Sequence, residues 1–299
     1  MIVPSKDWKL RDATSYTDAI AECYDRWVSV LSAPLAAHIC ERARLEQGQR
    51  VLDVGCGSGV ATRAAAAAVG ASGSVTGVDF SPAMIAVARA SRTESQRTEY
   101  LHMDAEALDL PDESFDAVIS LCAVAHFPDN TRALREMKRV LKTGGRLVIS
   151  FGYARPTAPV PLVLHSAKRV LQRVNVVQRR VQAPSSLMNF IVRAMGHPER
   201  GINTEWSRHQ PHRSLMKALR SLNMGAVERT WCGHEVEFQS ADDFADAQLA
   251  ICTEVRKGFS SEAAEAIVVD YRRSMRRARD TGAKLIYPYG AQFISATKL

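Results

Sequence analysis

The sequence lacks the features that mark membrane, secreted and zinc-binding proteins. It contains no run of 18 apolar residues, which a membrane-spanning helix needs. The opening stretch MIVPSKDWKLRD lacks the apolar core of a signal peptide. The six cysteines form no CxxC motif and no cluster with histidine. We therefore expect reduced thiols, no metal site and a cytoplasmic location.

Acidic residues are scarce in one part of the chain, where positive charge accumulates. The net charge is +7, and residues 165–220 hold eleven Lys or Arg against two acids. This segment lacks the regular aromatic residues that stack on bases, so a nucleic-acid partner is disfavoured. A solvated helix explains the charge. An acidic protein partner, a membrane surface beneath a lipophilic substrate, or an anionic substrate also remain open.

Apolar runs and helical patterns alternate from residue 50 onward. We predict strands at RVLDVG, SVTGVDF, TEYLHMDA, FDAVISLCAV and RLVISFG, and helices at VATRAAAAAVG, SPAMIAVARASR and TRALREMKRVLKTGG. Ser81 and Pro82 are typical of a helix N-cap and first helical residue, and Gly144 and Gly145 of a helix stop. The alternation predicts an α/β fold with a doubly wound, mostly parallel sheet covered on both faces.

We expect one domain over residues 1–299, built from four segments. We predict that residues 1–45 form a helical cap and that residues 45–152 form the alternating core. Residues 153–212, with six prolines, predict a helical insertion after strand five that covers the ligand pocket. Residues 213–299 predict a helix at RSLMKALRSLNMG and a strand at AVERTWCGHEVEF. A helical stretch from about 242 to 279 follows, and AKLIYPYGAQFISATK closes the chain as a strand or strand pair.

The stretch RVLDVGCGSG brings a ligand close to the backbone. Gly55, Gly57 and Gly59 follow the first predicted strand, and ligands of open parallel sheets bind beyond the strands' carboxyl ends. A tight turn without a ligand is the alternative. A dinucleotide is disfavoured, since Val60 replaces the third glycine of G-x-G-x-x-G and Asp53 would repel a pyrophosphate. The same carboxylate suits a ligand that carries ammonium and sulfonium groups.

VLDVGCGSG resembles the first motif of class I S-adenosylmethionine (SAM)-dependent methyltransferases. GVDFSPAMIAVAR is similar to the second motif, MDAEALDLPDESFDAVIS to the third and fourth, and REMKRVLKTGGRLVIS to the segment that leads into strand five. These motifs cover about residues 45–152 in the family's order, and the group most resembled contains the ubiquinone/menaquinone C-methyltransferases. The resemblance implies a Rossmann-like methyltransferase fold with a seven-stranded sheet, SAM as cofactor and S-adenosylhomocysteine as product.

The resemblance also implies a set of cofactor-binding residues. The glycine turn should face the methionine part of SAM, Asp79 should accept both ribose hydroxyls, and Asp104 should accept the adenine amino group. The backbone at the end of strand four should pass under the sulfonium. The implied set is Asp53, Gly55, Cys56, Gly57, Gly59, Asp79, Phe80, Met84, Met103, Asp104, Ala105, Leu121, Cys122 and His126.

Several of these residues have purely structural alternatives. Asp79 could cap the following helix, Asp104 could be a turn aspartate, and Phe80 could belong to the core. Cys56 is interpreted as a small filler inside the turn and not as a nucleophile. Aromatic residues near the N-terminus could close over SAM or pack an amphipathic helix, namely Tyr16, Tyr24 and Trp27.

Methyl transfer from SAM depends on alignment and exclusion of water, so the sequence need not show a catalytic residue. A base is needed only where the acceptor is protonated, and His126 is the candidate, with SAM support or helix capping as alternatives. The insertion offers His197, His209 and His212. No acidic trio indicates a catalytic Mg²⁺ site. No [N/D]-P-P-[Y/F] stretch follows strand four, which also disfavours nucleic acid as the acceptor.

These patterns together predict a SAM-dependent methyltransferase of a small, lipophilic or aromatic metabolite, as in secondary metabolism. Whether O, N or C is methylated stays open. Two alternatives remain. One is a non-catalytic SAM-binding protein on the same fold, and the other is an NAD-type oxidoreductase.

Overall fold

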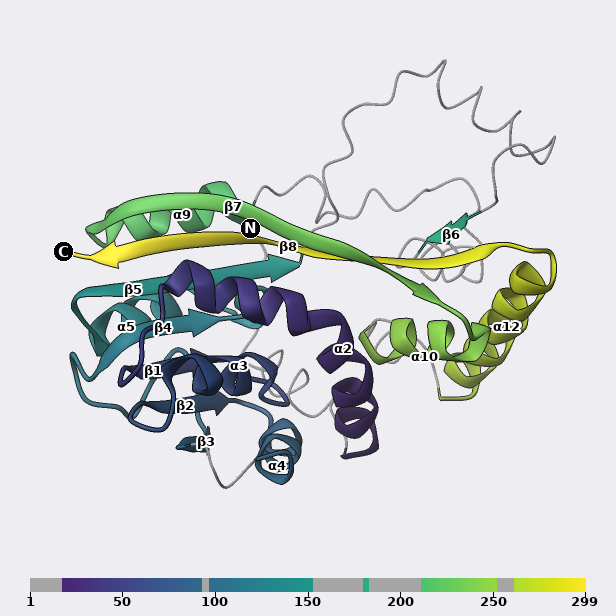
Figure 1. Ribbon diagram of the computed structural model, residues 1–299, viewed down its shortest axis with the longest axis horizontal. Helices are drawn as coiled ribbons and strands as arrows, with labels where there is room; N and C mark the ends of the chain where they lie inside the picture. Colours follow the sequence, from purple (N-terminus) through teal and green to yellow (C-terminus); the bar gives the residue numbers. More distant parts are fainter. Residues whose placement is uncertain (1–17, 93–96, 153–179, 183–210, 252–260) are drawn as a thin grey trace, which may run out of the picture. The chain divides into compact units, whose positions relative to one another are not determined.

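The computed structural model describes residues 18–92, 97–152, 180–182, 211–251 and 261–299. Helices and strands alternate along the first half of these residues, as the sequence predicts (Figure 1). In chain order they are α2 (Asp18–Ala43), β1 (Arg50–Val54), α3 (Val60–Val69), β2 (Ser74–Asp79), α4 (Pro82–Ala90), β3 (Thr98–His102), β4 (Phe115–Ser120), η1 (Val124–His126), α5 (Asn130–Val140), β5 (Leu141–Gly152), β6 (Arg180–Gln182), α9 (Pro211–Ser221), β7 (Met224–Phe238), α10 (Ala241–Ile251), α12 (Ser261–Asp280) and β8 (Lys284–Lys298).

The strands form a mixed, mostly parallel sheet. Its order is β3-β2-β1-β4-β5-β8-β6, and β7 pairs with β8. The pairs from β3 through β5 are parallel, whereas β8 runs antiparallel to β5. Chain order reverses at β1, which has β2 on one side and β4 on the other, so a crevice is expected beyond their carboxyl ends. The doubly wound fold class is confirmed, and the short strand β6 adds an eighth strand to the seven predicted.

The chain divides into two compact units. Unit 1 lies within residues 1–153, 209–233 and 290–299, and unit 2 within residues 154–208 and 234–289. The first break in unit 1 falls one residue after the predicted end of the alternating core. The four segments inferred from the sequence remain a prediction.

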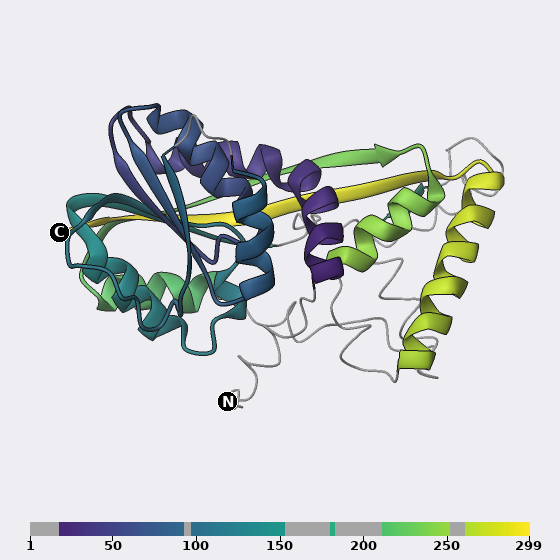
Figure 2. The ribbon, with the colours of Figure 1, turned by 90° about the horizontal axis from the view of Figure 1, so that it is seen from below.

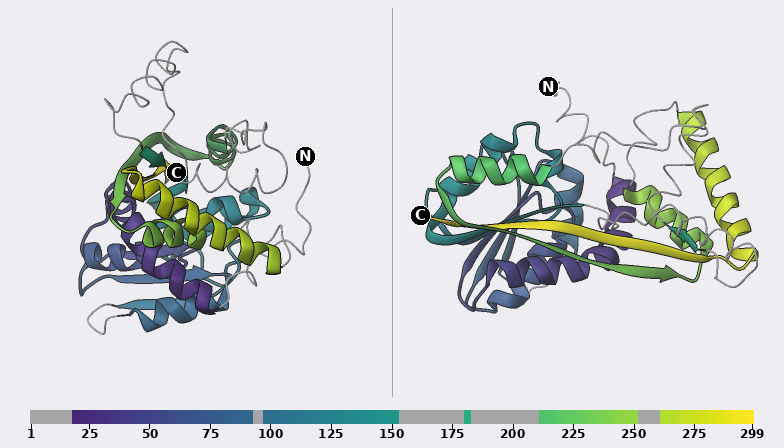
Figure 3. Two further views of the ribbon diagram at one scale, coloured as in Figure 1. Left: turned by 90° about the vertical axis from the view of Figure 1, so that its right-hand side faces the viewer. Right: turned by 90° about the horizontal axis from the view of Figure 1, so that it is seen from above.

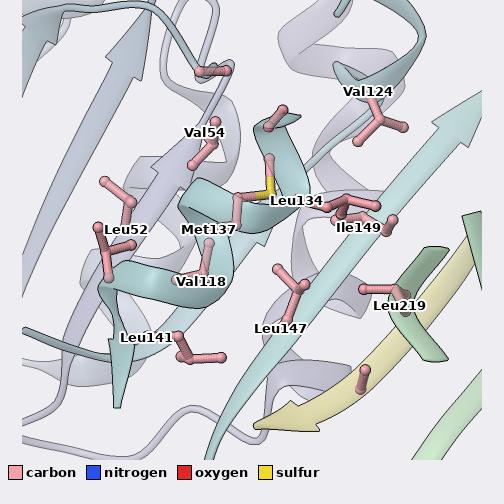
Figure 4. Close-up of a cluster of buried hydrophobic side chains, with 14 of the residues drawn as sticks. Leu52, Val54, Val118, Val124, Leu134, Met137, Leu141, Leu147, Ile149 and Leu219 are labelled. Atoms are coloured by element: carbon pink, nitrogen blue, oxygen red, sulfur yellow. The ribbon is translucent and has the colours of Figure 1, made fainter. Parts of the chain in front are cut away.

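Unit 1 has helices on both faces of its sheet, and a hydrophobic core lies between the sheet and the pair α5 and α9. α2 contacts α3 and α4 on one face, and α5 contacts α9 on the other (Figures 2 and 3). α5 is amphipathic because its apolar residues recur every three or four positions. Its buried side chains, Leu134 and Met137, meet Val118 and Ile149 from the strands and Leu219 from α9 (Figure 4). This layer supports the strands whose ends form the site.

Unit 2 contains β6, α10 and α12 together with parts of β7 and β8. β6 pairs in parallel with the start of β8, and α10 contacts α12. Between these two helices Gln248 Nε2 donates a hydrogen bond to the hydroxyl of Tyr271 at 2.6 Å, and both side chains are buried. A row of aromatic rings also forms here, with Phe238 5.7 Å from Phe244 and 6.4 Å from Tyr287.

Several predicted element boundaries are wrong. The helix predicted over TRALREMKRVLKTGG ends at Val140, because Leu141 adopts an extended backbone and is buried in the sheet. The strand predicted over FDAVISLCAV ends at Ser120, because Cys122 has a left-handed backbone (φ 56°). Within the described residues, the predicted helical stretch 242–279 holds α10 and α12, and the last segment forms the strand β8, in agreement with the prediction.

The predicted insertion 153–212 lies largely outside the described residues. Of this segment the structure describes β6 and the first two residues of α9. Arg180–Gln182 form a strand, where a helix was expected. The predicted cover over the acceptor pocket therefore stays a prediction.

Candidate functional site

A pocket opens at the carboxyl ends of β1, β2, β3 and β4 within unit 1. About 830 Å³ of space free of protein atoms lies in and over it, including the part that is open to solvent. Its position is the one that the reversal of strand order at β1 predicts. Eleven of the fourteen residues predicted to bind the cofactor line this pocket. The lining consists of Tyr24, Gly55, Gly57, Val78, Asp79, Phe80, Ser81, Met84, Met103, Asp104, Ala105, Leu121, Cys122, Ala123, His126 and Phe127.

The three glycines of the turn differ in what a side chain at each position would meet. All have positive φ, which favours glycine. A Cβ on Gly55 would lie 2.3 Å from Cβ of Ala123, and one on Gly59 would lie 2.6 Å from the hydroxyl of Tyr100. A Cβ on Gly57 would meet no atom within 4 Å. Gly57 is thus the position at which the turn leaves open space for a ligand, and Gly59 serves packing.

Asp79 joins the glycine turn to the start of α4. Its Oδ2 accepts a hydrogen bond from the Gly57 amide at 2.8 Å, and its Oδ1 accepts one from the Ser81 amide at 2.9 Å. Asp79 supports the residue that caps α4 but is not the cap, so the capping role considered for it is wrong. The helix cap itself is Ser81, whose Oγ accepts the Met84 amide. Burial raises the pKa of Asp79, while the two amides oppose that rise. Each carboxylate oxygen keeps capacity to accept a further hydrogen bond from a ligand.

Asp53, predicted to face the cofactor, does not line the pocket. Its side chain is fully buried, and Oδ2 accepts a hydrogen bond from Thr62 Oγ1 at 2.7 Å, while Oδ1 has no partner. This burial raises the pKa of Asp53 to about 7. Cys56 is also buried and outside the lining, and burial raises its thiol pKa well above the usual range. Such a thiol is a poor nucleophile, in keeping with its interpretation as a filler.

Asp53→Asn should remove a pH dependence of stability. The folded-state pKa of Asp53 lies above its unfolded value of 3.8. Its favourable contribution is therefore present below about pH 4 and is lost as the pH rises to about 7. Wild type should lose roughly 4 kcal/mol of unfolding free energy relative to Asp53→Asn across this window. Urea unfolding of both proteins at several pH values measures the difference. Parallel profiles would contradict the prediction, and Asp109→Asn, at an exposed carboxylate, serves as control.

The segment after β3 forms the adenine side of the predicted site. Met103, Asp104 and Ala105 all line the pocket. Asp104 Oδ1 accepts the Glu106 amide at 2.9 Å, so the turn role considered for Asp104 is present as well. Arg139 of α5 holds the segment in place. Its Nη2 and Nη1 donate to the carbonyl oxygens of residues 108 and 110 at 2.8 and 2.7 Å.

The chain that follows β4 forms the opposite side of the pocket. Leu121 and Cys122 line it just beyond the end of the strand. The Cys122 amide donates to Ser150 Oγ at 2.9 Å, which holds a backbone conformation rarely adopted by non-glycine residues. His126 lies in η1, is exposed, and lines the pocket with Phe127.

Some residues of the lining are outside the set predicted from the sequence. Val78, Ala123 and Phe127 lack a distinctive motif, and Ser81 was recognised only as a helix cap. Tyr24 of α2 lines the pocket, as was considered for it. Tyr16, His197 and His209 lie outside the described residues, as does the side chain of His212 in α9. Trp27 of α2 is not in the lining.

Comparison with known proteins identifies the core of unit 1. Residues 52–149 match the family model described as a methyltransferase domain. These residues contain the glycine turn and all the lining except Tyr24. They form a class I SAM-dependent methyltransferase domain. The cofactor of such domains is SAM.

Two curated relatives of this domain are named demethylmenaquinone methyltransferases. The chain is 37% identical over 147 residues to a demethylmenaquinone methyltransferase of Staphylococcus aureus, covering 47% of this chain and 60% of that protein. The corresponding protein of Staphylococcus epidermidis is 35% identical over 145 residues, with the same coverage. The match therefore spans less than two thirds of the length of these relatives.

Solved structures share the fold over most of the chain. Phosphoethanolamine N-methyltransferase 2 of Haemonchus contortus, solved with S-adenosyl-L-methionine, has a TM-score of 0.53 and 19% identity, covering 95% of this chain and 58% of that one. The [4+2]-cyclase SpnF has a TM-score of 0.50 and 22% identity, covering 89% and 80%. At these identities the likeness shows the fold alone, and the same fold carries different reactions.

The described helices were also compared with the requirements of a bilayer. None of those within the described ranges is both long and apolar enough to cross a membrane.

Proposed function

We propose that this protein transfers the methyl group of SAM to a small, lipophilic or aromatic metabolite. One observation supports SAM as the cofactor. The Asp79 carboxylate lies at the end of β2, bonded to the backbone of Gly57, the turn position that leaves open space. A nucleoside with an attached amino acid needs these two features, an acceptor for ribose hydroxyls and room beside the backbone. The names of the curated relatives support an acceptor of quinone type.

The lining residues fit the chemical parts of SAM. When bound, SAM would supply a methyl group activated by its sulfonium: the acceptor would bond to the methyl carbon in line with the breaking C–S bond, and S-adenosylhomocysteine would leave. Asp79 would hold the ribose, and Asp104 the adenine edge. Phe80, Met84 and Met103 provide the apolar surface for the ring. The protein's contribution is alignment and exclusion of water, which account for much of the rate in such transfers.

Two measurements test the function. Calorimetric titration should show SAM and S-adenosylhomocysteine binding in the micromolar range, a free energy of about −8 kcal/mol, and no binding of NADH. Incubation with SAM labelled in its methyl group and a reduced 2-prenyl-1,4-naphthoquinone should yield labelled product. Binding without transfer to this acceptor or to any component of a metabolite extract would favour a non-catalytic SAM-binding protein. NADH binding without SAM binding would overturn the proposal.

His126 is proposed as the general base for an acceptor that is protonated at neutral pH. Its support is its place in the pocket lining on the side formed by η1. His126→Gln should lower kcat roughly 100-fold or more, since positioned bases contribute that much. It should leave SAM affinity unchanged. Turnover assays and calorimetric titration with SAM give the two readouts.

His102→Gln is the matched control for this prediction. His102 lies at the end of β3, and its Nε2 is 3.0 Å from the carbonyl oxygen of Phe80, but it is not in the pocket lining. This substitution should leave kcat unchanged. If His126→Gln weakens SAM binding without changing kcat, His126 supports the cofactor and is not the base.

A further inference from the structure

Arg63 of α3 links the glycine turn to α2, the helix that packs against α3. Its Nη1 donates to the carbonyl oxygen of Ser58 at 2.7 Å, within the turn. Its Nη2 lies 3.6 Å from Asp25 Oδ1 and 3.5 Å from Ser29 Oγ, both on α2. Ser29 Oγ in turn donates to Asp25 Oδ1 at 2.8 Å. One guanidinium therefore connects the loop that shapes the pocket with the helix that covers it.

The part of α2 that Arg63 holds also reaches the pocket. Tyr24 lines the pocket and directly precedes Asp25 in the helix. The side chains of Arg63 and Asp25 are each 25% exposed. Partial removal from water strengthens their attraction relative to an ion pair on the open surface. The ion pair thus acts on the segment that places Tyr24.

A proline interrupts the hydrogen bonding of α2 between this segment and the rest of the helix. Pro34 lies inside α2, and its missing amide leaves the carbonyl of residue 30 without a helical partner. The helix bends along its length in two perpendicular views (Figures 1 and 2). Beyond the proline, Leu35 and Ile39 are fully buried and hold the C-terminal half by packing. Before the proline, Val28 and Leu31 are buried too, so the N-terminal half is held by packing together with the polar contacts of Arg63.

We propose that Arg63 is a positioning residue that latches the N-terminal half of α2, hinged at Pro34, over the cofactor pocket. Docking of this half places Tyr24 in the lining, and Arg63 fixes the turn that faces the same space. Docking and cofactor binding are therefore coupled, and each strengthens the other. The coupling to SAM rests on the proposed function, whereas the latch itself is a property of the ligand-free protein.

The test is a double-mutant cycle of Arg63→Gln and Asp25→Asn. Each single variant should weaken SAM binding roughly tenfold. This is the loss of affinity expected when one hydrogen-bonded charge pair is broken. The double variant should bind SAM no more weakly than either single one, because both break the same link. Calorimetry gives the affinities, and thermal melting confirms that each variant folds. Arg273→Gln is the control, since Arg273 pairs with Asp270 within α12.

Hydrogen exchange of the ligand-free protein supplies a second readout. Amides of residues 21–33 should exchange several-fold faster in both single variants, whereas amides of residues 35–43 should not change. If Asp25→Asn leaves SAM affinity and exchange unchanged while Arg63→Gln weakens binding, Arg63 supports only the turn and the latch is overturned. Additive losses in the cycle would overturn it too. If wild type binds no SAM, the proposed function fails, and exchange still decides whether the latch exists.

Discussion

Gly57→Asp should abolish SAM binding while the protein remains folded. The position has a positive φ of 53° and open space where a side chain would project. Aspartate adopts this backbone conformation more readily than most residues, so the fold should tolerate it. The new carboxylate would occupy the space expected for the methionine part of SAM and would lie close to Asp79, whose Oδ2 accepts the amide of residue 57. We expect affinity to fall by more than about 100-fold, or roughly 3 kcal/mol.

Two control variants make this result specific. Gly144 also has a positive φ, 79°, and a Cβ there would also meet no atom within 4 Å. Gly144→Asp therefore repeats the backbone strain and the added charge away from the pocket, and should bind SAM as wild type does. Gly57→Ala adds only a methyl group and should give an intermediate loss. Calorimetric affinities near wild type for Gly57→Asp, in a protein with a normal melting curve, would show that the cofactor lies elsewhere.

Asp79→Ala should weaken SAM binding at least tenfold. Loss of the carboxylate would leave the two ribose hydroxyls without their acceptor, at a cost of roughly 1–3 kcal/mol or more. It would also remove the acceptor of the Gly57 and Ser81 amides, so the turn itself should loosen and thermal stability should fall. The affinity loss therefore has two sources, contact with the ribose and support of the turn.

A ribose-modified ligand separates these two sources. Wild type should prefer S-adenosylhomocysteine over its 2′,3′-dideoxy analogue about tenfold or more, because the analogue cannot donate to Asp79. Asp79→Ala should bind both ligands equally weakly. A preference that survives in Asp79→Ala would mean that Asp79 supports the turn and does not contact the ribose. Asp79→Asn, which keeps one acceptor oxygen, should lie between the two proteins.

Much of the site could be predicted from the sequence because it depends on local patterns. The alternation of apolar runs and helices determines a parallel sheet, and parallel strands bring their carboxyl ends to one edge. Residues at the ends of those strands or shortly after them, such as Gly57, Asp79 and Asp104, must then lie near one another. The cap at Ser81 and the helix start at Pro82 likewise depend only on neighbouring residues.

Only the tertiary structure decided which side of a strand end a side chain occupies and which distant segments meet there. Asp53 and Asp79 are both acids at strand ends, yet packing against α3 buries Asp53 beside Thr62 while Asp79 reaches the pocket. Tyr24 enters the lining from α2, and Arg63 meets Asp25, through contacts between helices. Such contacts depend on how helices lie on the sheet, an arrangement set by the fit of many buried side chains together and not by any short stretch of sequence.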